Sequence, residues 1–449
     1  MQLSTTVLSA LALSITAVDA LPIGSKSESI RPYSQEALDQ FSVLRFLGTA
    51  SPYVQNTGYG IERDAPYQCK VTQANLISRH GERYPTSNQG KKMAKHFEQI
   101  QNGTETIEGP LSFLKDYEFK ALDEEGLDQE TGKGPYSGLL DLYKHGALFR
   151  DRYDDLYNEG DEIKFYSASQ KRVVESAKKF AQGFLGESYN ESYIQEIDED
   201  TNDLGANSLT PVNACNNYDK HINQDKIDEL STSFLNKTAD RLNNQSPGIN
   251  LIPEQVGSLI YYCGFELNVE GSNQICEIFT TDELLAYSYT KDVSYYYEKG
   301  PGNNLSATIG SVYIDAITRL IKDDSKNLTL SFAHDTDIFY IVSLLGLFDG
   351  ELPTDHQSFN HLWKISNIAP MGARLVIERL ECEDQEEPFV RIIHNDAVLP
   401  IPGHSEGPGY SISISDFEKY IEDKLDGKTY EKDCGTKDGV PTELTFFWD

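Results

Sequence analysis

Residues 74–85, ANLISRHGERYP, place a short β-like run directly before a cluster of charged side chains. The run at residues 74–78 is brief and mostly apolar, which is typical of a buried strand. After Pro85 the sequence becomes helix-like as far as Ile100. A strand, a polar turn and a helix in succession form the repeating unit of an α/β sheet protein.

Two further segments repeat this design. Residues 163–167, IKFYS, precede Arg172, after which apolar residues recur at helical spacing. Residues 328–333, LTLSFA, precede His334 and Asp335, and another apolar stretch follows. Ligands of parallel sheets bind beyond the carboxyl ends of the strands. We therefore expect a parallel sheet in which the three charged clusters meet, although they lie far apart in the chain.

The chain has 449 residues, enough for one large domain with a sizeable insertion. The stretch at residues 187–304 contains an acidic run and a tyrosine-rich segment, and we expect it to form a mainly α-helical cap. We expect the α/β catalytic domain to comprise residues 21–186 and 305–449, with helices on both faces of the sheet and catalytic residues at the strand C-terminal ends. Further strands are expected at residues 373–380, 390–393 and 397–401.

His80 stands between two arginines, which favours a functional role over a structural one. A lone histidine is most simply explained by packing, but Arg79 and Arg83 in so acidic a chain point to a site. Guanidinium groups match phosphate oxygens with paired donors, and their charge disfavours protonation of a neighbouring imidazole. Gly81 permits a tight turn and the close approach of a ligand. The cluster therefore predicts phosphoryl transfer to the histidine nitrogen.

The motif at residues 79–85 resembles the R-H-G-x-R-x-P signature of the histidine acid phosphatases. This family includes secreted acid phosphatases and phytases of yeasts and fungi. His334 and Asp335 match the second family signature, a His-Asp pair after a strand, and Arg172 matches its third element, an arginine between a strand and a helix. The resemblance runs from about residue 41 to the C-terminus and implies an α/β fold with a helical cap.

The resemblance implies a role for each matched residue. His80 would accept the phosphoryl group, and Asp335 would give a proton to the leaving group and then activate the hydrolytic water. As charge builds in the transition state, the phosphoryl oxygens would be held by Arg79, Arg83, Arg172 and His334. We expect no metal ion or other cofactor, because the arginines supply the positive charge.

Small phosphate monoesters are therefore the expected substrates, and a secreted acid phosphatase is the expected enzyme. The alternative is a phytase that has the same mechanism and a pocket for inositol hexaphosphate. In the filamentous-fungal phytases a lysine follows the signature, whereas this chain has Gln89 there and Lys91 and Lys92 just after it. Two more distant alternatives are a metal-dependent His-Asp phosphohydrolase, for whose further ligands the sequence offers no candidates, and a non-catalytic glycoprotein that keeps the fold.

Six cysteines, an even number with no C-x-x-C pair, indicate disulfides rather than a zinc or redox site. Six cysteines allow fifteen pairings, and spacing alone does not choose among them. The resemblance to the histidine acid phosphatases implies Cys69–Cys382, Cys215–Cys434 and Cys263–Cys276. With this pairing, we expect mild reduction to loosen the C-terminal segment and the cap before the sheet.

The N-terminus indicates export. Residues 1–20 have a short polar start, an apolar run too short to span a bilayer, and small residues around a cleavage point after Ala20, which together predict a signal peptide. We expect a secreted protein, outside the cell or in its wall. We also expect glycosylation at N-x-S/T sequons, which occur at Asn102, Asn190, Asn236, Asn244, Asn304 and Asn327.

The net charge of −32 argues against nucleic acid as a partner, and any anionic substrate must therefore be held by a local group of cations. Beyond the N-terminal segment, no apolar run reaches membrane-spanning length, so a membrane partner is not expected. The sequence leaves the oligomeric state open, a homo-oligomer included.

Overall fold

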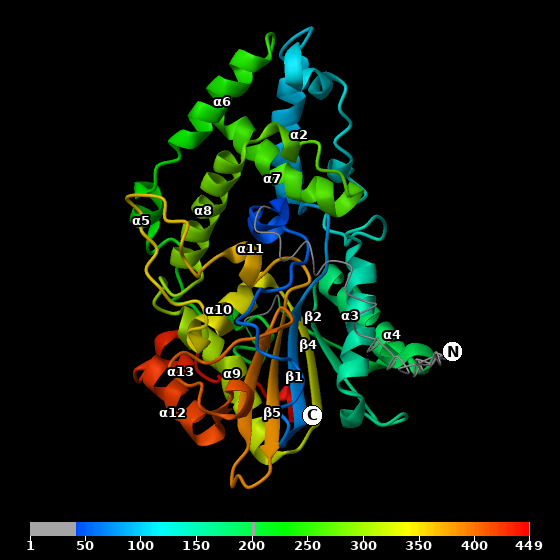
Figure 1. The fold of residues 1–449 in the computed structure, drawn as a ribbon, viewed down its shortest axis with the longest axis vertical. Helices are drawn as coiled ribbons and strands as arrows, with labels where there is room; N and C mark the ends of the chain where they lie inside the picture. Colours follow the sequence, from blue (N-terminus) through cyan, green and yellow to red (C-terminus); the bar gives the residue numbers. More distant parts are fainter. Residues whose placement is uncertain (1–41, 200–202, 449) are drawn as a thin grey trace, which may run out of the picture. The chain divides into compact units, whose positions relative to one another are not determined.

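A computed structural model describes residues 42–199 and 203–448, so the predicted signal peptide at residues 1–20 lies outside the described part. The described residues form an eight-stranded sheet in the order β3-β2-β4-β1-β5-β6-β7, with β8 paired to β6 (Figure 1). The strands are β1 (Cys69–Arg79), β2 (Phe165–Ala168), β3 (Ile194–Ile197), β4 (Leu328–Ala333), β5 (Arg374–Cys382), β6 (Phe389–His394), β7 (Ala397–Val398) and β8 (Ile412–Ser413).

The sheet has a parallel half and an antiparallel half. β1, β2, β3 and β4 run parallel, and the register pairs Arg79 with Ala333 and Ser167 with Phe332. The carboxyl ends of β1, β2 and β4 therefore lie level at one edge. β5 joins β1 antiparallel, and β6, β7 and β8 continue in that sense. The α/β class is confirmed, but the sheet is mixed rather than parallel throughout.

Helices cover both faces of the sheet (Figure 1). α3 and α4 pack together on one side, while α9, α10 and α12 pack with one another on the other. A Cβ on Gly146 would collide with the backbone of Phe180, so glycine allows α3 and α4 to approach closely. The helices of the described residues are α2 (Ser87–Asn102), α3 (Gly138–Arg152), α4 (Lys171–Leu185), α5 (Gln224–Glu229), α6 (Ser233–Gln245), α7 (Pro253–Glu270), α8 (Thr281–Glu298), α9 (Ser306–Asp323), α10 (Asp335–Leu345), α11 (Ile365–Ile368), α12 (Ile414–Leu425) and α13 (Tyr430–Asp433).

A second hydrophobic core lies outside the sheet, where α2, α6, α7 and the start of α8 pack with a segment around Leu44–Val54. Among its fully buried side chains are Phe97 of α2 and Tyr262 of α7, whose rings meet edge to face at 5.3 Å. The cap expected at residues 187–304 thus shares this core with α2, and its first part supplies β3 to the sheet. The cap boundaries remain a prediction.

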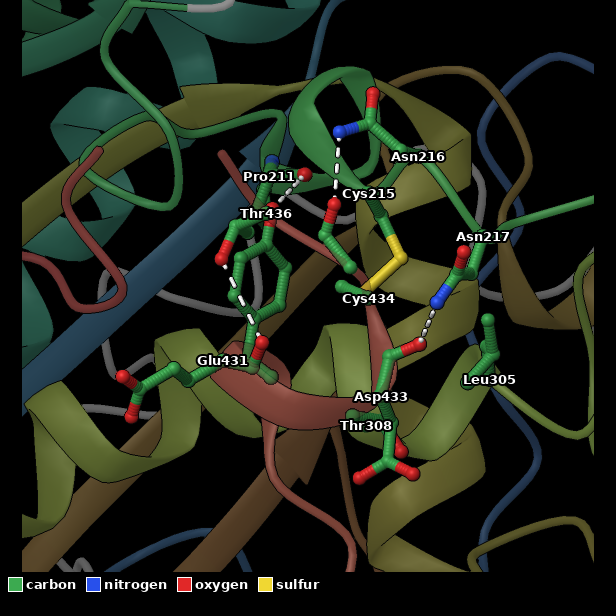
Figure 2. The surroundings of a disulfide bond; sticks show 12 residues. Pro211, Cys215, Asn216, Asn217, Leu305, Thr308, Glu431, Asp433, Cys434 and Thr436 are labelled. Atoms are coloured by element: carbon green, nitrogen blue, oxygen red, sulfur yellow. Dashed lines mark hydrogen bonds between the residues drawn. A yellow bond between two sulfur atoms is a disulfide. The ribbon is translucent and has the colours of Figure 1, made fainter. Parts of the chain in front are cut away.

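The six cysteines form Cys69–Cys382, Cys215–Cys434 and Cys263–Cys276, the same pairs that the resemblance implies. Cys69 and Cys382 pair directly across the end of the β1–β5 ladder. Around the Cys215–Cys434 bond, Asn216 donates to the Gly435 carbonyl and Asn217 to the Asp433 carbonyl, both at 2.9 Å (Figure 2). This bond therefore fastens the C-terminal segment within a network of side-chain hydrogen bonds.

The burial of the disulfides predicts that Cys69–Cys382 is the first bond to be reduced, whereas the sequence led us to expect that the C-terminal segment and the cap loosen before the sheet. Cys69 and Cys382 are partly exposed, whereas the cysteines of the other two bonds are at most 5% exposed. We expect brief treatment with dithiothreitol to open Cys69–Cys382 while activity persists, because the β1–β5 ladder still holds both ends. Alkylation and peptide mapping measure the order, and earlier labelling of Cys215 or Cys434 would contradict it.

The asparagines of all six sequons are exposed, so none is blocked from carrying a glycan by burial in this chain. Within residues 42–199 and 203–448, no helix combines the length and apolarity that crossing a membrane requires.

Candidate active site

The ends of three parallel strands bring the predicted site residues together. His80 follows β1, Arg172 lies in the first turn of α4 after β2, and His334 and Asp335 follow β4 at the start of α10. The rings of His80 and His334 lie 5.9 Å apart, centre to centre. The positive charges of Arg79, Arg172 and Arg83 are close enough to lower the pKa of His80. All six predicted residues therefore belong to one site.

A backbone hydrogen bond fixes the His80 imidazole. Its side chain is buried, and Nδ1 lies 2.9 Å from the carbonyl oxygen of Gly81. A carbonyl oxygen only accepts hydrogen bonds, so Nδ1 carries the hydrogen and Nε2 keeps its lone pair. Burial, and then the nearby arginines, hold the pKa of His80 well below the usual histidine range. The imidazole is therefore neutral at pH values where an ordinary histidine is already protonated.

This environment predicts the acid limb of the pH profile. If His80 is the nucleophile that the sequence predicts, it must be neutral to react, and kcat/KM is expected to hold in acid until well below about pH 6.5, the ordinary histidine value. Arg79 is the largest charged contributor to this shift. Arg79→Gln removes a cation that opposes protonation, so it should move the limb to higher pH whatever it does to the maximal rate. A wild-type limb at or above the ordinary value, or an unmoved limb in the variant, would contradict this.

Two side chains accept hydrogen bonds from the turn that follows His80. The backbone N–H of Gly81 donates to Glu130 Oε1 at 2.6 Å and to Ser176 Oγ at 3.0 Å. A Cβ at residue 81 would lie 2.7 Å from the carbonyl oxygen of Gly138, which is why this turn needs glycine. Burial raises the pKa of Glu130 to about 8, so it is a neutral acid at low pH.

Arg79 and Arg83 are fixed before any ligand arrives. Arg79 Nη1 donates to the carbonyl oxygens of Thr49 and Ala369, both at 2.8 Å. Arg83 Nη1 donates to the Tyr84 carbonyl at 2.7 Å, and its guanidinium lies 5.7 Å from the centre of the Phe265 ring. Burial lowers the pKa of Arg83 to about 10, so it remains a cation in acid. Such fixed cations can stabilise developing charge without reorganising.

Asp335 is the first residue of α10 and faces several cations. Its Oδ2 lies 3.6 Å from Arg79 Nη2, and Oδ1 accepts the N–H of Thr336 at 2.9 Å. Burial raises the pKa of Asp335, but Arg79, Lys299 and His334 outweigh it and hold the pKa well below its usual range. In the free protein Asp335 is therefore a carboxylate. Sequence reasoning missed Lys299, which directly follows the end of α8.

His334 has a carboxylate partner that the sequence did not reveal. Its Nε2 lies 2.8 Å from Glu199 Oε2, and both side chains are largely buried. Glu199 Oε1 also accepts the backbone N–H of Gln170, two residues before Arg172, at 2.8 Å. Glu199 lies in the acidic run at residues 196–203, to which the sequence analysis assigns no role.

Gln89, where the filamentous-fungal phytases have a lysine, is occupied in capping a helix. Its Oε1 accepts the N–H of Thr86 at 3.0 Å at the start of α2, and its Nε2 donates to Tyr261 Oη at 2.7 Å. Gln89 therefore joins α2 to α7 rather than offering a free cation to a ligand.

A family model described as histidine phosphatase superfamily (branch 2) matches residues 70–395. The chain belongs to this family. A phytase of Candida albicans is 40% identical to it over 426 residues, 92% of each chain. An acid phosphatase of Komagataella pastoris is 39% identical and covers 93% of this chain and 92% of its own length. The resemblance inferred from the sequence is thus confirmed, and this branch 2 histidine phosphatase is a phosphatase enzyme.

Solved structures of other proteins agree with the fold. The phytase from D. castellii superposes with a TM-score of 0.88 at 37% identity and covers 95% of both chains. A multiple inositol polyphosphate phosphatase of Bifidobacterium longum gives 0.66 at 16% identity over 87% of this chain and 99% of that one. At that identity the second match supports the fold alone.

Proposed function

We propose that this histidine phosphatase hydrolyses phosphate monoesters at acid pH through a covalent phosphohistidine on His80. The observation that carries the proposal is the buried, neutral imidazole of His80. Its Nδ1 is hydrogen-bonded to the Gly81 carbonyl, which leaves the lone pair of Nε2 available, and three arginines lie nearby. A neutral nitrogen nucleophile among fixed cations suits attack on an anionic phosphoryl group.

The reaction follows from the positions of the charges. Arg79, Arg83, Arg172 and His334 hold the phosphoryl oxygens while His80 Nε2 forms the P–N bond and the P–O bond to the alcohol breaks. Asp335 gives its proton to the departing oxygen. The same carboxylate then takes a proton from water, which attacks phosphohistidine and releases phosphate and the free imidazole.

Asp335 must be protonated for the first step, although the free enzyme holds it ionised. A bound phosphate brings negative charge to the same cations that lower the pKa of Asp335. We infer that substrate binding offsets these cations and raises the pKa of Asp335, so that the proton arrives with the substrate or from solvent.

A phytase is the second candidate, and the similarity to the phytases of Candida albicans and D. castellii favours it. The helix-capping role of Gln89 supports the broader acid phosphatase, because this side chain adds no cation for a second phosphate. Comparing kcat/KM for phytate with that for p-nitrophenyl phosphate and glycerol phosphate in acid decides between them. We expect the small esters to be hydrolysed efficiently, and a strong preference for phytate would make the phytase proposal correct.

Activity should survive chelators. Within residues 42–199 and 203–448, no group of three or more His, Cys, Asp or Glu side chains is placed to hold a metal ion. We therefore expect rates in EDTA to equal those without it. Loss of activity that a divalent cation restores would move the enzyme to the metal-dependent His-Asp class.

We also propose that the protein is secreted, with a cleaved segment at residues 1–20 and glycans on exposed sequons. Sequencing the N-terminus of the mature protein tests cleavage after Ala20. A change in electrophoretic mobility after treatment with an endoglycosidase tests glycosylation.

A further inference from the structure

The carboxylate of Glu199 touches two of the elements that carry phosphate ligands. Oε2 lies 2.8 Å from His334 Nε2, at the end of β4. Oε1 accepts the N–H of Gln170, at 2.8 Å, in the turn between β2 and α4. Both oxygens are therefore in use, and each is tied to a different strand end.

The surroundings fix this carboxylate rather than leaving it on a mobile surface. Glu199 is 3% exposed, and its backbone N–H donates to Ser169 Oγ at 3.3 Å. Its backbone carbonyl accepts from Asn213 Nδ2 at 2.6 Å. Although burial raises the pKa of Glu199, hydrogen bonding and charge from His334, the Gln170 N–H and Arg172 lower it further. The carboxylate therefore stays ionised to a lower pH than an ordinary glutamate does.

The contact decides which edge of the His334 ring is available. A carboxylate accepts hydrogen bonds, so Nε2 carries a hydrogen that it donates to Glu199. The ring can then meet a phosphate only through its other edge, which bears Nδ1. Carboxylate partners fix the orientation and hydrogen placement of histidines in this way at other catalytic and metal sites.

We propose that Glu199 is a positioning residue, which orients His334 and locks it to the turn carrying Arg172, so that these two phosphate ligands act as one unit. This inference rests on the proposed function, because it concerns how the same site holds the phosphoryl group. Glu199 touches no reacting atom in this account and acts through His334 and the Gln170 turn.

The test is a double-mutant cycle between Glu199→Gln and His334→Ala. Glutamine keeps the size of the side chain but carries no charge and only one acceptor oxygen, so it cannot accept from both His334 Nε2 and the Gln170 N–H. We expect Glu199→Gln to lower kcat/KM about 10–100-fold, by analogy with the loss found when the carboxylate partner of a metal-binding histidine is removed. Inhibition by inorganic phosphate should weaken in parallel. The double variant should lose little beyond His334→Ala alone, because both changes remove the same interaction.

The control is Glu196→Gln in β3, three residues before Glu199, because the Glu196 side chain is exposed and its replacement should leave activity unchanged. Thermal unfolding checks the fold of each variant. If Glu199→Gln does not fold, Glu199→Asp replaces it, since it keeps the charge but shortens the reach by one methylene, and the same non-additivity is expected.

Two results would overturn the proposal: a Glu199 variant with wild-type kinetics, or losses that multiply in the double variant, which would mean that Glu199 acts independently of His334. The proposed function fails by a different result, a wild-type enzyme that forms no phosphohistidine. The double-mutant cycle compares rates of hydrolysis among variants and does not depend on detecting phosphohistidine. The failure of this proposal and the failure of the proposed function are therefore distinguishable.

Discussion

His80→Ala is expected to lower turnover by about 10⁶-fold, the scale of loss when an enzyme loses its covalent nucleophile. The variant lacks the only atom of the proposed site that forms a bond to phosphorus. Arg79 and Arg83 keep their backbone hydrogen bonds, which do not involve His80, so the phosphate-binding cations remain in place. Steady-state kinetics measure the loss, and calorimetric titration with inorganic phosphate is expected to show that binding persists.

The matched control is His221→Ala, because His221 is exposed and lies outside the site. It should retain wild-type turnover. A His80→Ala enzyme that keeps more than about one hundredth of the wild-type rate would contradict a role in covalent catalysis, since removal of a general acid or base alone costs losses of that order or larger.

Asp335→Asn is expected to slow alkyl phosphates by about 10²–10⁴-fold and activated aryl phosphates far less. An alkoxide leaves poorly without a proton, whereas p-nitrophenolate leaves without one. The measurement compares kcat/KM for glycerol phosphate and p-nitrophenyl phosphate on the same variant, because kcat/KM reports the steps up to phosphohistidine formation and excludes the later hydrolysis that both substrates share. The aryl substrate is the internal control, because damage to the fold or to phosphate binding would affect both substrates equally.

An equal loss on both substrates would remove Asp335 from the role of general acid. Lys299 would then be the residue to examine, because it is the cation besides Arg79 that acts most strongly on Asp335. The charges of Arg79 and Lys299 hold the Asp335 carboxylate of the free enzyme ionised. The pH at which Asp335 gains its proton therefore depends on how far a bound phosphate offsets these two cations.

The central part of the fold could be predicted because its signals are local. β1, β2 and β4 each appear as an apolar run followed by charged side chains, and the geometry of parallel strands brings those ends to one edge. The direction of β5 and β6 could not be predicted in this way. An apolar run has the same appearance in a parallel and an antiparallel strand, and β1 has one neighbour of each kind.

The sequence predicts the residues of the candidate site that lie within short sequence motifs. His80, Arg79 and Arg83 are consecutive or nearly so, and their residue types carry the chemistry. Glu199 was hidden because it meets His334 across 135 positions of sequence, and an acidic run gives no sign that one of its members is buried. Side-chain packing selects that member, and no periodicity in the sequence reports it.

For the disulfides, loop length and burial lead to different expectations about reduction, and the labelling experiment decides between them. In the chain-entropy model, a disulfide that closes a long loop stabilises the folded protein by on the order of 4–5 kcal/mol. Loop length does not determine how easily a reductant reaches the sulfur atoms, because that depends on their burial. The Cys215–Cys434 bond closes a long loop and is also deeply buried.

The measurement that tests the central claim most directly is trapping of the phosphoenzyme. Wild-type enzyme is mixed with a ³²P-labelled monoester, quenched in alkali within milliseconds, digested, and mapped by mass spectrometry. Phosphohistidine survives alkali and is lost in acid, which separates it from phosphoserine. We predict stoichiometric, acid-labile label on His80. Label on another residue, or turnover without any labelled intermediate under conditions where release of the alcohol outpaces release of phosphate, would contradict the account.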